Sequence, residues 1–185
     1  ALAALADRKP ARLEWATGKL RFAQNRRQLN GGLVDHDFPL LAVRSPDGTL
    51  RALFASYASH TTTLGADVNE SHGDWAGGAQ QAIEADHPGA VALIALGAAG
   101  ECIPTGVREL PPPLRLAETT RLGRVVADEV RRLLDRGLKP ITAAPAGRVK
   151  SIDLPLQPLP SRAEWQARLT QTGPAVAYHA RKNLA

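Results

Sequence analysis

The chain has 185 residues, of which 44% are apolar, and its formal net charge is +5. That length suits one packed domain, and no apolar run approaches the ~18–20 residues that span a bilayer. A single cysteine excludes an internal disulfide and a zinc site built from several cysteines. The arginines are spread along the chain with few aromatic residues between them, so the sequence argues against a nucleic-acid partner.

Both ends of the sequence look like the middle of a helix. The chain starts in a run of alanine and leucine, has no methionine, and stops in a second helical run at 178–185. The opening run lacks the basic start and the full apolar stretch of a signal peptide. We therefore expect residues 1–185 to form a single partial α/β domain that is truncated at both ends. The localisation and the oligomeric state stay open.

Two apolar runs, 40–44 and 50–57, flank the turn sequence Ser-Pro-Asp-Gly-Thr at 45–49, which predicts a β-hairpin. The second run is almost continuously apolar, so we expect its strand to be buried on both faces. A polar loop follows it, and residues 74–86 then have the spacing of a helix.

The rest of the chain continues the alternation of strands and helices. Five further elements are expected: a buried strand at 90–96, a long helix at 114–138, an exposed or edge strand at 148–154, a helix opened by a capping box at 161–164, and a last helix after Pro174. Gly137 and Pro140 provide a C-cap and a stop for the long helix. The fold class is α/β, a mixed sheet with flanking helices.

His60 is the main candidate for chemistry, because it stands where an apolar strand gives way to a polar loop. In open α/β sheets ligands bind at the carboxyl ends of the strands. A neutral imidazole at that place is a good zinc ligand. The alternative is a histidine that caps the strand end with two hydrogen bonds. No second ligand lies at short spacing, so a metal site needs distant partners.

The small-residue segment that follows the strand at 90–96 is a second candidate. It reads LGAAGECIP, and its free N–H groups, around Gly100 and Glu101, are positioned to bind an anion or a developing oxyanion. The alternative is a tight turn that only needs small residues. Cys102 is either a nucleophile or a packed thiol, and no local signature supports the nucleophile.

Two further places carry polar candidates. Asp74 opens the helix at 74–86, beside His72, and is either a helix cap or a functional carboxylate. Asn25 and Arg26 belong to a basic turn, Asn-Arg-Arg, that is either exposed or clamps a carboxylate or phosphate.

Taken in order, these features resemble the N-terminal catalytic domain of the neutral (non-lysosomal) ceramidase family. The matching segments are PARLEWATGKLRFAQNRR, VDHDFPLLAVRSPDGTLRALFASYASHTTTLG, HGDWAGGAQQAIE, ALIALGAAGECIP, RLGRVVADEVRRLL and IDLPLQPLPSRAEWQARL. They span nearly the whole chain. The order and spacing of the set make it more specific than any single motif.

The resemblance implies a zinc-dependent amidase that hydrolyses the N-acyl bond of a ceramide-like lipid or another N-acyl small molecule. His60 then falls on one zinc ligand, and the family's further histidine, glutamate and tyrosine ligands have no matching position in this chain. The implied roles are catalytic for Asp74, Gly100 and Glu101, and substrate-binding for Asn25 and Arg26. Family members are often secreted or membrane-facing, which implies a secreted or periplasmic protein with peripheral contact with membrane lipid.

One departure from the family bears on the mechanism. Ceramidases carry a serine in a GDxSP-like segment, where this chain reads Gly-Glu-Cys-Ile-Pro at 100–104. Ile103 stands at the serine position and Glu101 at the aspartate position. Zinc-bound water attacks a carbonyl without a serine, so the leading hypothesis is a zinc amidohydrolase. The alternatives are a catalytically inactive relative that binds a ligand or serves as a structural module, and a metal-independent hydrolase that uses Cys102.

Overall fold

The computed structural model describes residues 2–28, 31–66, 68–107, 109–144 and 146–185. The chain divides into two compact units, Ala1–Ala144 and Pro145–Ala185. The single truncated domain expected over 1–185 stays a prediction. None of the helices in the described ranges is both long enough and apolar enough to cross a membrane.

A five-stranded mixed sheet forms the body of the first unit, in the order β5-β4-β3-β1-β7. Its strands are β1 (Arg12–Lys19), β3 (Asp37–Arg44), β4 (Leu50–Tyr57), β5 (Val91–Leu96) and β7 (Lys139–Ile141). β5 runs parallel to β4, and the other neighbours pair antiparallel. The predicted hairpin is confirmed: Gly48 takes a φ of 92°, which glycine adopts without steric cost, and closes the turn between β3 and β4.

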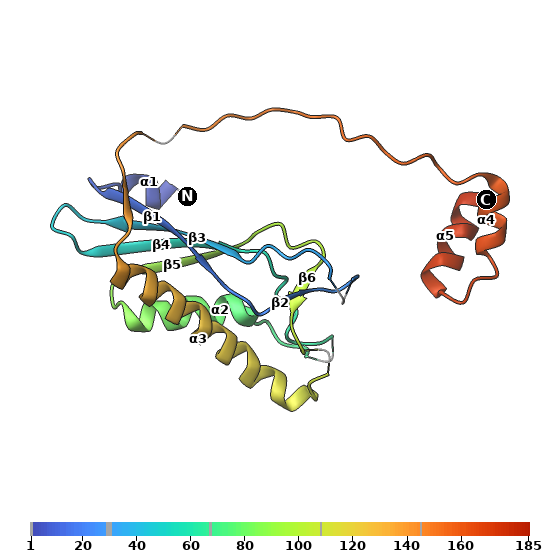
Figure 1. The fold of residues 1–185 in the computed structure, drawn as a ribbon, viewed down its shortest axis with the longest axis horizontal. Coiled ribbons are helices and arrows are strands. Elements are labelled where there is room, and N and C mark those ends of the chain that lie inside the picture. The colour runs from blue at the N-terminus through green and yellow to red at the C-terminus, as the bar shows by residue number, and fades with distance from the viewer. Residues whose placement is uncertain (1, 29–30, 67, 108, 145) are drawn as a thin grey trace. The chain divides into compact units, whose positions relative to one another are not determined.

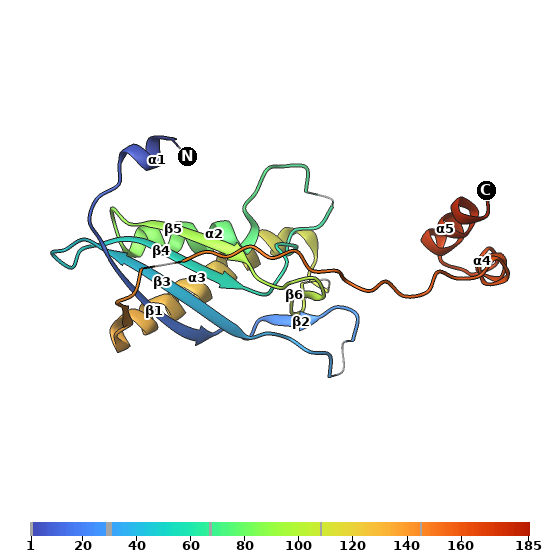
Figure 2. The ribbon, with the colours of Figure 1, turned by 90° about the horizontal axis from the view of Figure 1, so that it is seen from above.

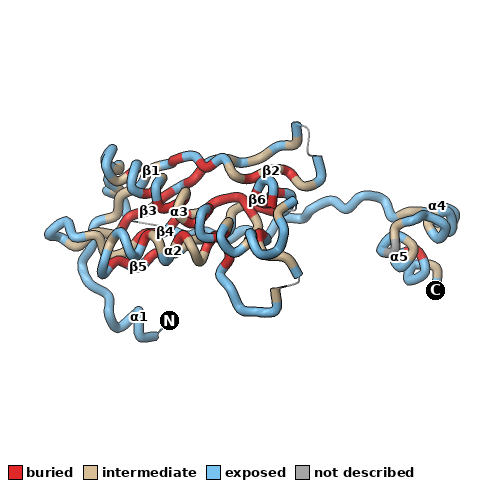
Figure 3. The backbone as a smooth tube through the Cα atoms, turned by 90° about the horizontal axis from the view of Figure 1, so that it is seen from below, coloured by how far each residue is buried: buried red, intermediate tan, exposed pale blue. Residues whose placement is uncertain are grey.

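Two helices, α2 (Asp74–Asp86) and α3 (Pro112–Arg136), cover one face of this sheet (Figure 1). α2 has the predicted bounds. α3 begins two residues earlier than predicted because prolines suit the first helical positions. It ends at Arg136, before the predicted limit of 138, and Gly137 is its C-cap as expected. Buried residues gather where the helices meet the sheet (Figure 3). The largest of them are Phe38, Leu40, Leu53, Tyr57, Trp75, Ile83, Leu122, Val126 and Val130.

α2 and α3 approach each other closely at two glycines. A Cβ atom on Gly123 would overlap the backbone of Gly78, and one on Gly78 would come within 3.1 Å of the carbonyl oxygen of Thr119. The helices therefore touch backbone to backbone at this crossing. Their spacing over the sheet depends on the absence of side chains there.

The other face of the sheet also carries apolar side chains. The strand register places Trp15, Leu41, Phe54 and Leu93 in one row across four strands. Trp15, Phe54 and Leu93 are 44%, 45% and 53% exposed. This row is apolar although it is open to solvent.

The prediction that the strands at 50–57 and 90–96 are buried on both faces is therefore wrong. Leu53, Ala55 and Tyr57 are buried on the helical face of β4, whereas Phe54 between them is exposed. β5 is an edge strand in which Val91 and Leu93 are exposed. The physical reason is that α2 and α3 pack on the same face of the sheet.

A second, two-stranded sheet consists of β2 (Ala23–Asn25) and β6 (Cys102–Pro104). The strands pair antiparallel, with Asn25 opposite Cys102. They lie side by side at the end of the main sheet towards which β4 runs (Figures 1 and 2). This small sheet joins the Asn-Arg-Arg turn to the small-residue segment 97–104.

Outside this body, α1 (Leu2–Ala6) is a single exposed turn of helix. The edge strand predicted at 148–154 is wrong: these residues lie in neither helix nor strand, and Ile152 and Leu154 are 67% and 75% exposed. Alternation alone does not make a strand when no described strand pairs with the segment. β7, directly after α3, is the strand that pairs with the free edge of β1.

The second unit contains α4 (Arg162–Arg168) and α5 (Pro174–Leu184). The predicted capping box opens α4: Ser161 Oγ accepts from the Glu164 N–H, and Glu164 Oε2 accepts from the Ser161 N–H at 2.6 Å. α5 follows Pro174 as predicted.

Candidate functional site

A cavity of about 290 Å³ lies at the carboxyl end of β4. Its lining is formed by Arg26, His60, Thr62 and Ile103. Three of these residues were singled out in the sequence, and the fold brings them together from three separate segments. Thr62 was missed, and the only signal for it was its place in the threonine-rich loop after His60. The position is where open α/β sheets bind ligands.

The backbone of His60 is held on both sides. Its N–H donates to the Cys102 carbonyl oxygen at 2.8 Å, and its carbonyl oxygen accepts from Trp75 Nε1 at 3.0 Å. The loop after β4 is thereby tied to β6 and to the first turn of α2. The imidazole itself is half-buried and has no hydrogen-bond partner among the described residues. The alternative, in which His60 caps the strand end, needs two hydrogen bonds from the imidazole. The described residues provide neither of them.

An aromatic cluster anchors the strand that carries His60. The rings of Phe22, Tyr57 and Trp75 meet edge to face, with centroids 4.8 to 6.0 Å apart. The Tyr57 hydroxyl donates to the Leu20 carbonyl and accepts from the Ala23 N–H, each at 3.1 Å. Burial raises the pKa of Tyr57 to about 12. The cluster fixes the end of β4 against the segment that leads to Arg26.

Arg26 follows β2 directly and contacts the segment 97–104. Its backbone N–H donates to the Glu101 carbonyl oxygen at 2.7 Å, and Nη2 donates to the Gly100 carbonyl oxygen at 3.1 Å. Its Nε is buried and has no hydrogen-bond partner. The nearest basic neighbour, Arg27, approaches the Glu101 carboxylate at 3.8 Å. Within the described ranges, no carboxylate pairs with Arg26.

Asn25 is buried and uses its whole side chain inside the turn. Nδ2 donates to the Leu33 carbonyl and to Glu101 Oε2, each at 3.1 Å. Oδ1 accepts from the N–H groups of Arg27 and Gln28. With its donors and acceptors occupied, Asn25 shapes the turn that presents Arg26 and holds the Glu101 carboxylate. A contact between Asn25 and substrate stays a prediction.

The segment 97–104 presents carbonyl oxygens to the site. The N–H groups of Gly97, Ala99 and Cys102 donate to carbonyls of Tyr57, Gly97 and Ala99. Gly100 and Glu101 are exposed, do not line the cavity, and meet Arg26 through their carbonyl oxygens. Their predicted catalytic role stays a prediction. Towards Arg26, both residues present backbone carbonyl oxygens that accept hydrogen bonds.

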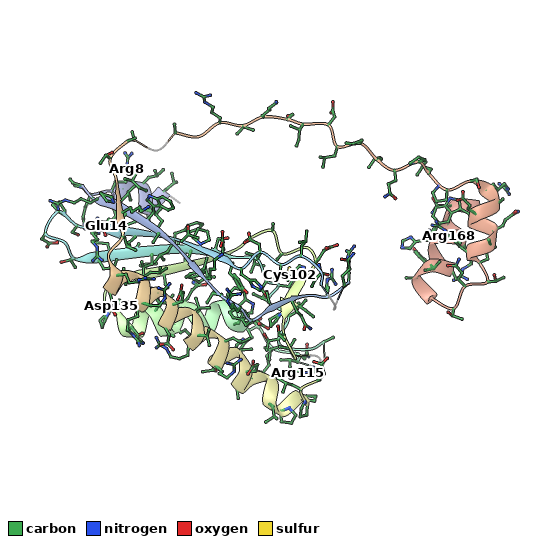
Figure 4. The ribbon with its side chains drawn as sticks, in the orientation of Figure 1. Arg8, Glu14, Cys102, Arg115, Asp135 and Arg168 are labelled. Atoms are coloured by element: carbon green, nitrogen blue, oxygen red, sulfur yellow. The ribbon has the colours of Figure 1, made fainter. Side chains whose placement is uncertain are left out.

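Cys102 lies on β6 within the first unit (Figure 4) and is 4% exposed. Burial raises the pKa of its thiol, and the negative charge of Glu101 raises it further. The thiolate is the reactive form of cysteine, so both effects oppose a nucleophilic role. The residue contributes instead through its backbone carbonyl, which holds His60.

Asp74 ties the loop before α2 to the helix. It is 4% exposed and adopts a φ of 53°, which is uncommon for a residue other than glycine. Oδ2 accepts from the Leu64 N–H at 3.0 Å, Oδ1 accepts from the Trp75 N–H at 2.7 Å, and its own N–H donates to His72 Nδ1. Asp74 is not among the residues that line the cavity beside His60. Its catalytic role stays a prediction.

A second cavity, of about 360 Å³, lies between the loop 64–72 and the start of α3. Leu64, His72 and Leu116 are among its lining residues. Leu116, which lies on α3, is 54% exposed. No pattern in the sequence indicates this cavity, because a loop forms much of its wall.

The described residues do not by themselves make a metal centre. Nowhere in the described ranges do three or more His, Cys, Asp or Glu side chains come together as a metal-binding group. Zinc sites use at least three protein ligands. The imidazole of His60 lines a cavity without a hydrogen-bond partner among the described residues, and its role as a zinc ligand stays a prediction. Its neighbour Arg26 is a cation and cannot ligate.

Comparison with known proteins points to one fold. No protein-family model matches the chain, and no curated protein matches it. Among solved structures, a ceramidase complexed with C2 matches with a TM-score of 0.64 and 21% identity, and a neutral ceramidase from Pseudomonas aeruginosa with 0.64 and 20%. Each match covers 74% of this chain and 24% of the other. The ceramidase-like α/β fold predicted from the sequence is thus confirmed.

Proposed function

We propose that this ceramidase-like chain is the part of an amidohydrolase that receives the N-acyl group of a ceramide-like lipid at the cavity beside His60. The observation that carries the proposal is the His60 imidazole, which lines a cavity at the carboxyl end of β4 and has no hydrogen-bond partner among the described residues. The likeness in fold to ceramidases supports the same reading. Because the chain spans about a quarter of those proteins, the whole reaction belongs to the proposal.

His60 would serve as one zinc ligand, with the remaining ligands outside the described residues. A zinc ion, when bound, polarises an amide carbonyl and lowers the pKa of a water molecule. The residues of this chain would bind and orient the substrate. Arg26 would hold a polar oxygen through its free N–H groups, and Ile103 would exclude water from one wall of the cavity.

The test is the zinc content per chain by elemental analysis, after purification without a metal-affinity resin. The wild type is compared with His60→Ala and with His179→Ala, which removes an exposed histidine from α5. Near-stoichiometric zinc that disappears only in His60→Ala would support the proposal. Zinc that survives in His60→Ala would refute the assigned ligand.

Hydrolysis is measured on the same preparations with a fluorescent short-chain N-acyl sphingosine. Release of the fatty acid by the wild type, and its loss in His60→Ala, would support amide hydrolysis. No zinc and no hydrolysis in any preparation would refute the claim that this chain is an enzyme by itself.

A ligand-binding relative without catalysis is the second candidate. Ile103 favours it, because this side chain takes the place of the family serine and lines the cavity with an alkyl group. In that case the chain would bind an N-acyl compound without zinc and without turnover. The test is to incubate zinc-free protein with the lipid, measure binding, and analyse the lipid by mass spectrometry. Binding that leaves the lipid chemically unchanged would identify this function.

A further inference from the structure

Among the described residues that line the cavity beside His60, Arg26 is the one whose positive charge is permanent. It is half-buried, its Nε is buried without a partner, and the only acceptor its guanidinium has among the described residues is the neutral carbonyl of Gly100. Withdrawing a charge from water is costly unless an opposite charge compensates it. Among the described residues, no negative charge therefore compensates the positive charge of Arg26 in the cavity.

The carboxylate of Glu101 makes its contacts with other residues. Glu101 follows Gly100 directly, yet its Oε2 accepts from Asn25 Nδ2 and its Oε1 lies 3.8 Å from Arg27 Nε. The turn thus directs Arg27 towards the acid and Arg26 towards the cavity. None of the described residues that line the cavity is acidic. This arrangement leaves Arg26 available to an anion from outside.

The remaining lining residues indicate what kind of anion fits. Ile103 is 4% exposed and offers an alkyl wall, and Thr62 is exposed and offers a hydroxyl. A cavity of about 290 Å³ with one permanent cation suits a single negative charge attached to an apolar chain. Guanidinium and carboxylate match in geometry, because parallel N–H groups meet two oxygens.

We propose that the cavity beside His60 binds a carboxylate whose apolar chain lies against Ile103, with Arg26 as the anion-binding residue. Two compounds provide this chemistry: the fatty acid that amide hydrolysis releases, or an N-acyl amino acid that enters as substrate. The second source makes the substrate anionic, in contrast to a neutral ceramide, and this assignment rests on the proposed amide hydrolysis. Carboxylate binding at Arg26 does not depend on it.

The experiment is isothermal titration of the full chain, dialysed against a chelator, with three probes: octanoate, N-octanoylglycine and the neutral N-octanoylethanolamine. We expect one or both anions to bind at least about tenfold more tightly than the neutral amide, because a charged hydrogen-bonded pair replaces an uncharged contact. Octanoate binding alone identifies a product site, and N-octanoylglycine binding alone a substrate site. Equal affinity for the neutral amide, or no binding of either anion, overturns the proposal.

Two pairs of variants assign the effect to Arg26. Arg26→Gln should weaken anion binding by about tenfold or more, whereas Arg27→Gln, which changes the exposed neighbour, should not. Thr62→Glu places a carboxylate in the cavity, and it should weaken anion binding by about tenfold relative to Thr62→Gln. The Thr62 pair keeps the test decisive if Arg26→Gln fails to fold. Unchanged binding in folded Arg26→Gln, or equal binding by the two Thr62 variants, overturns the proposal.

The two proposals fail separately. Anion binding without zinc or hydrolysis would contradict amide hydrolysis by this chain on its own and leave the carboxylate site standing. Zinc binding and hydrolysis of N-acyl sphingosine without anion binding would overturn the carboxylate site alone.

Discussion

Trp75 Nε1 donates a hydrogen bond to the carbonyl oxygen of His60 at 3.0 Å. Trp75 belongs to the first turn of α2, and its side chain is fully buried. The core therefore fixes the backbone of a loop residue whose side chain stands in a cavity. Because Trp75 also meets Phe22 and Tyr57, the packing of the aromatic cluster and the position of His60 are one structural unit.

Trp75→Phe is expected to destabilise the protein by about 2–4 kcal/mol, since it leaves the His60 carbonyl without its donor and opens space in the core. The free energy of unfolding in urea measures the effect. Trp15→Phe is the matched control, because Trp15 is 44% exposed on the open face of the sheet. It should cost less than about 1 kcal/mol. Equal losses in the two variants would contradict a special role for Trp75.

The close contact between α2 and α3 predicts that two glycine substitutions change the stability of the protein in opposite directions. Gly123→Ala should destabilise the protein by about 1–3 kcal/mol, since its Cβ overlaps the Gly78 backbone. Gly77→Ala, on the same helix as Gly78, meets no atom within 4 Å and should stabilise by about 0.5–1 kcal/mol. Thermal unfolding of the two variants provides the comparison. Stabilisation by Gly123→Ala would mean that the helices separate without cost.

Tyr57 predicts a loss of stability at alkaline pH. Its pKa is raised from 10.0 to about 12 by burial, so the folded state keeps the proton that the unfolded state releases. The contribution to stability is complete below pH 10 and falls by about 2 kcal/mol as the pH rises towards 12. Unfolding free energies across this range should show the slope. Tyr57→Phe should flatten it, and an unchanged slope in that variant would assign the loss to other groups.

Asp86 predicts a loss of stability at acid pH. Hydrogen bonds from Arg124 lower its pKa from 3.8 to about 2, and Arg131 contributes further. The contribution is complete above pH 3.8 and is lost as the pH falls through about 2. Since the carboxylate is 25% exposed, about 1–2 kcal/mol is the expected size.

Asp86→Asn should flatten the acid limb of the stability curve. Asp135→Asn changes an exposed acid near the end of α3 and should leave the loss of stability at acid pH unchanged. A steep limb in Asp86→Asn would show that other carboxylates control acid unfolding.

The sequence predicted the elements whose signals are local. The turn at 45–49, the bounds of α2 and the capping box of α4 depend on neighbouring residues and are confirmed. The prediction that β4 and β5 are buried on both faces was wrong, because apolar composition does not show whether helices cover one face of a sheet or both. The strand at 148–154 was wrong because pairing needs a partner that alternation cannot provide.

The sequence indicated only some of the residues of the candidate site, because sequence signals are local and the site depends on long-range contacts. His60 stood out by its place after a strand, and Arg26 by its motif. Their meeting with Ile103 depends on the pairing of β2 with β6, and no spacing in the sequence reveals that pairing. The hydrogen bond from Trp75 and the commitment of Asn25 to its own turn are tertiary facts, and the sequence carried no sign of either.

The pairing of β7 with β1 has a consequence for the order of folding. β3 and β4 are joined by a short turn, so their pairing is local and can form early. The pairing of Leu13 with Ile141 instead closes a loop that contains nearly the whole first unit. That ladder spans only three residues on each strand. We expect β7 to join last and to open first, so its amide hydrogens should exchange with solvent well before those of β3 and β4.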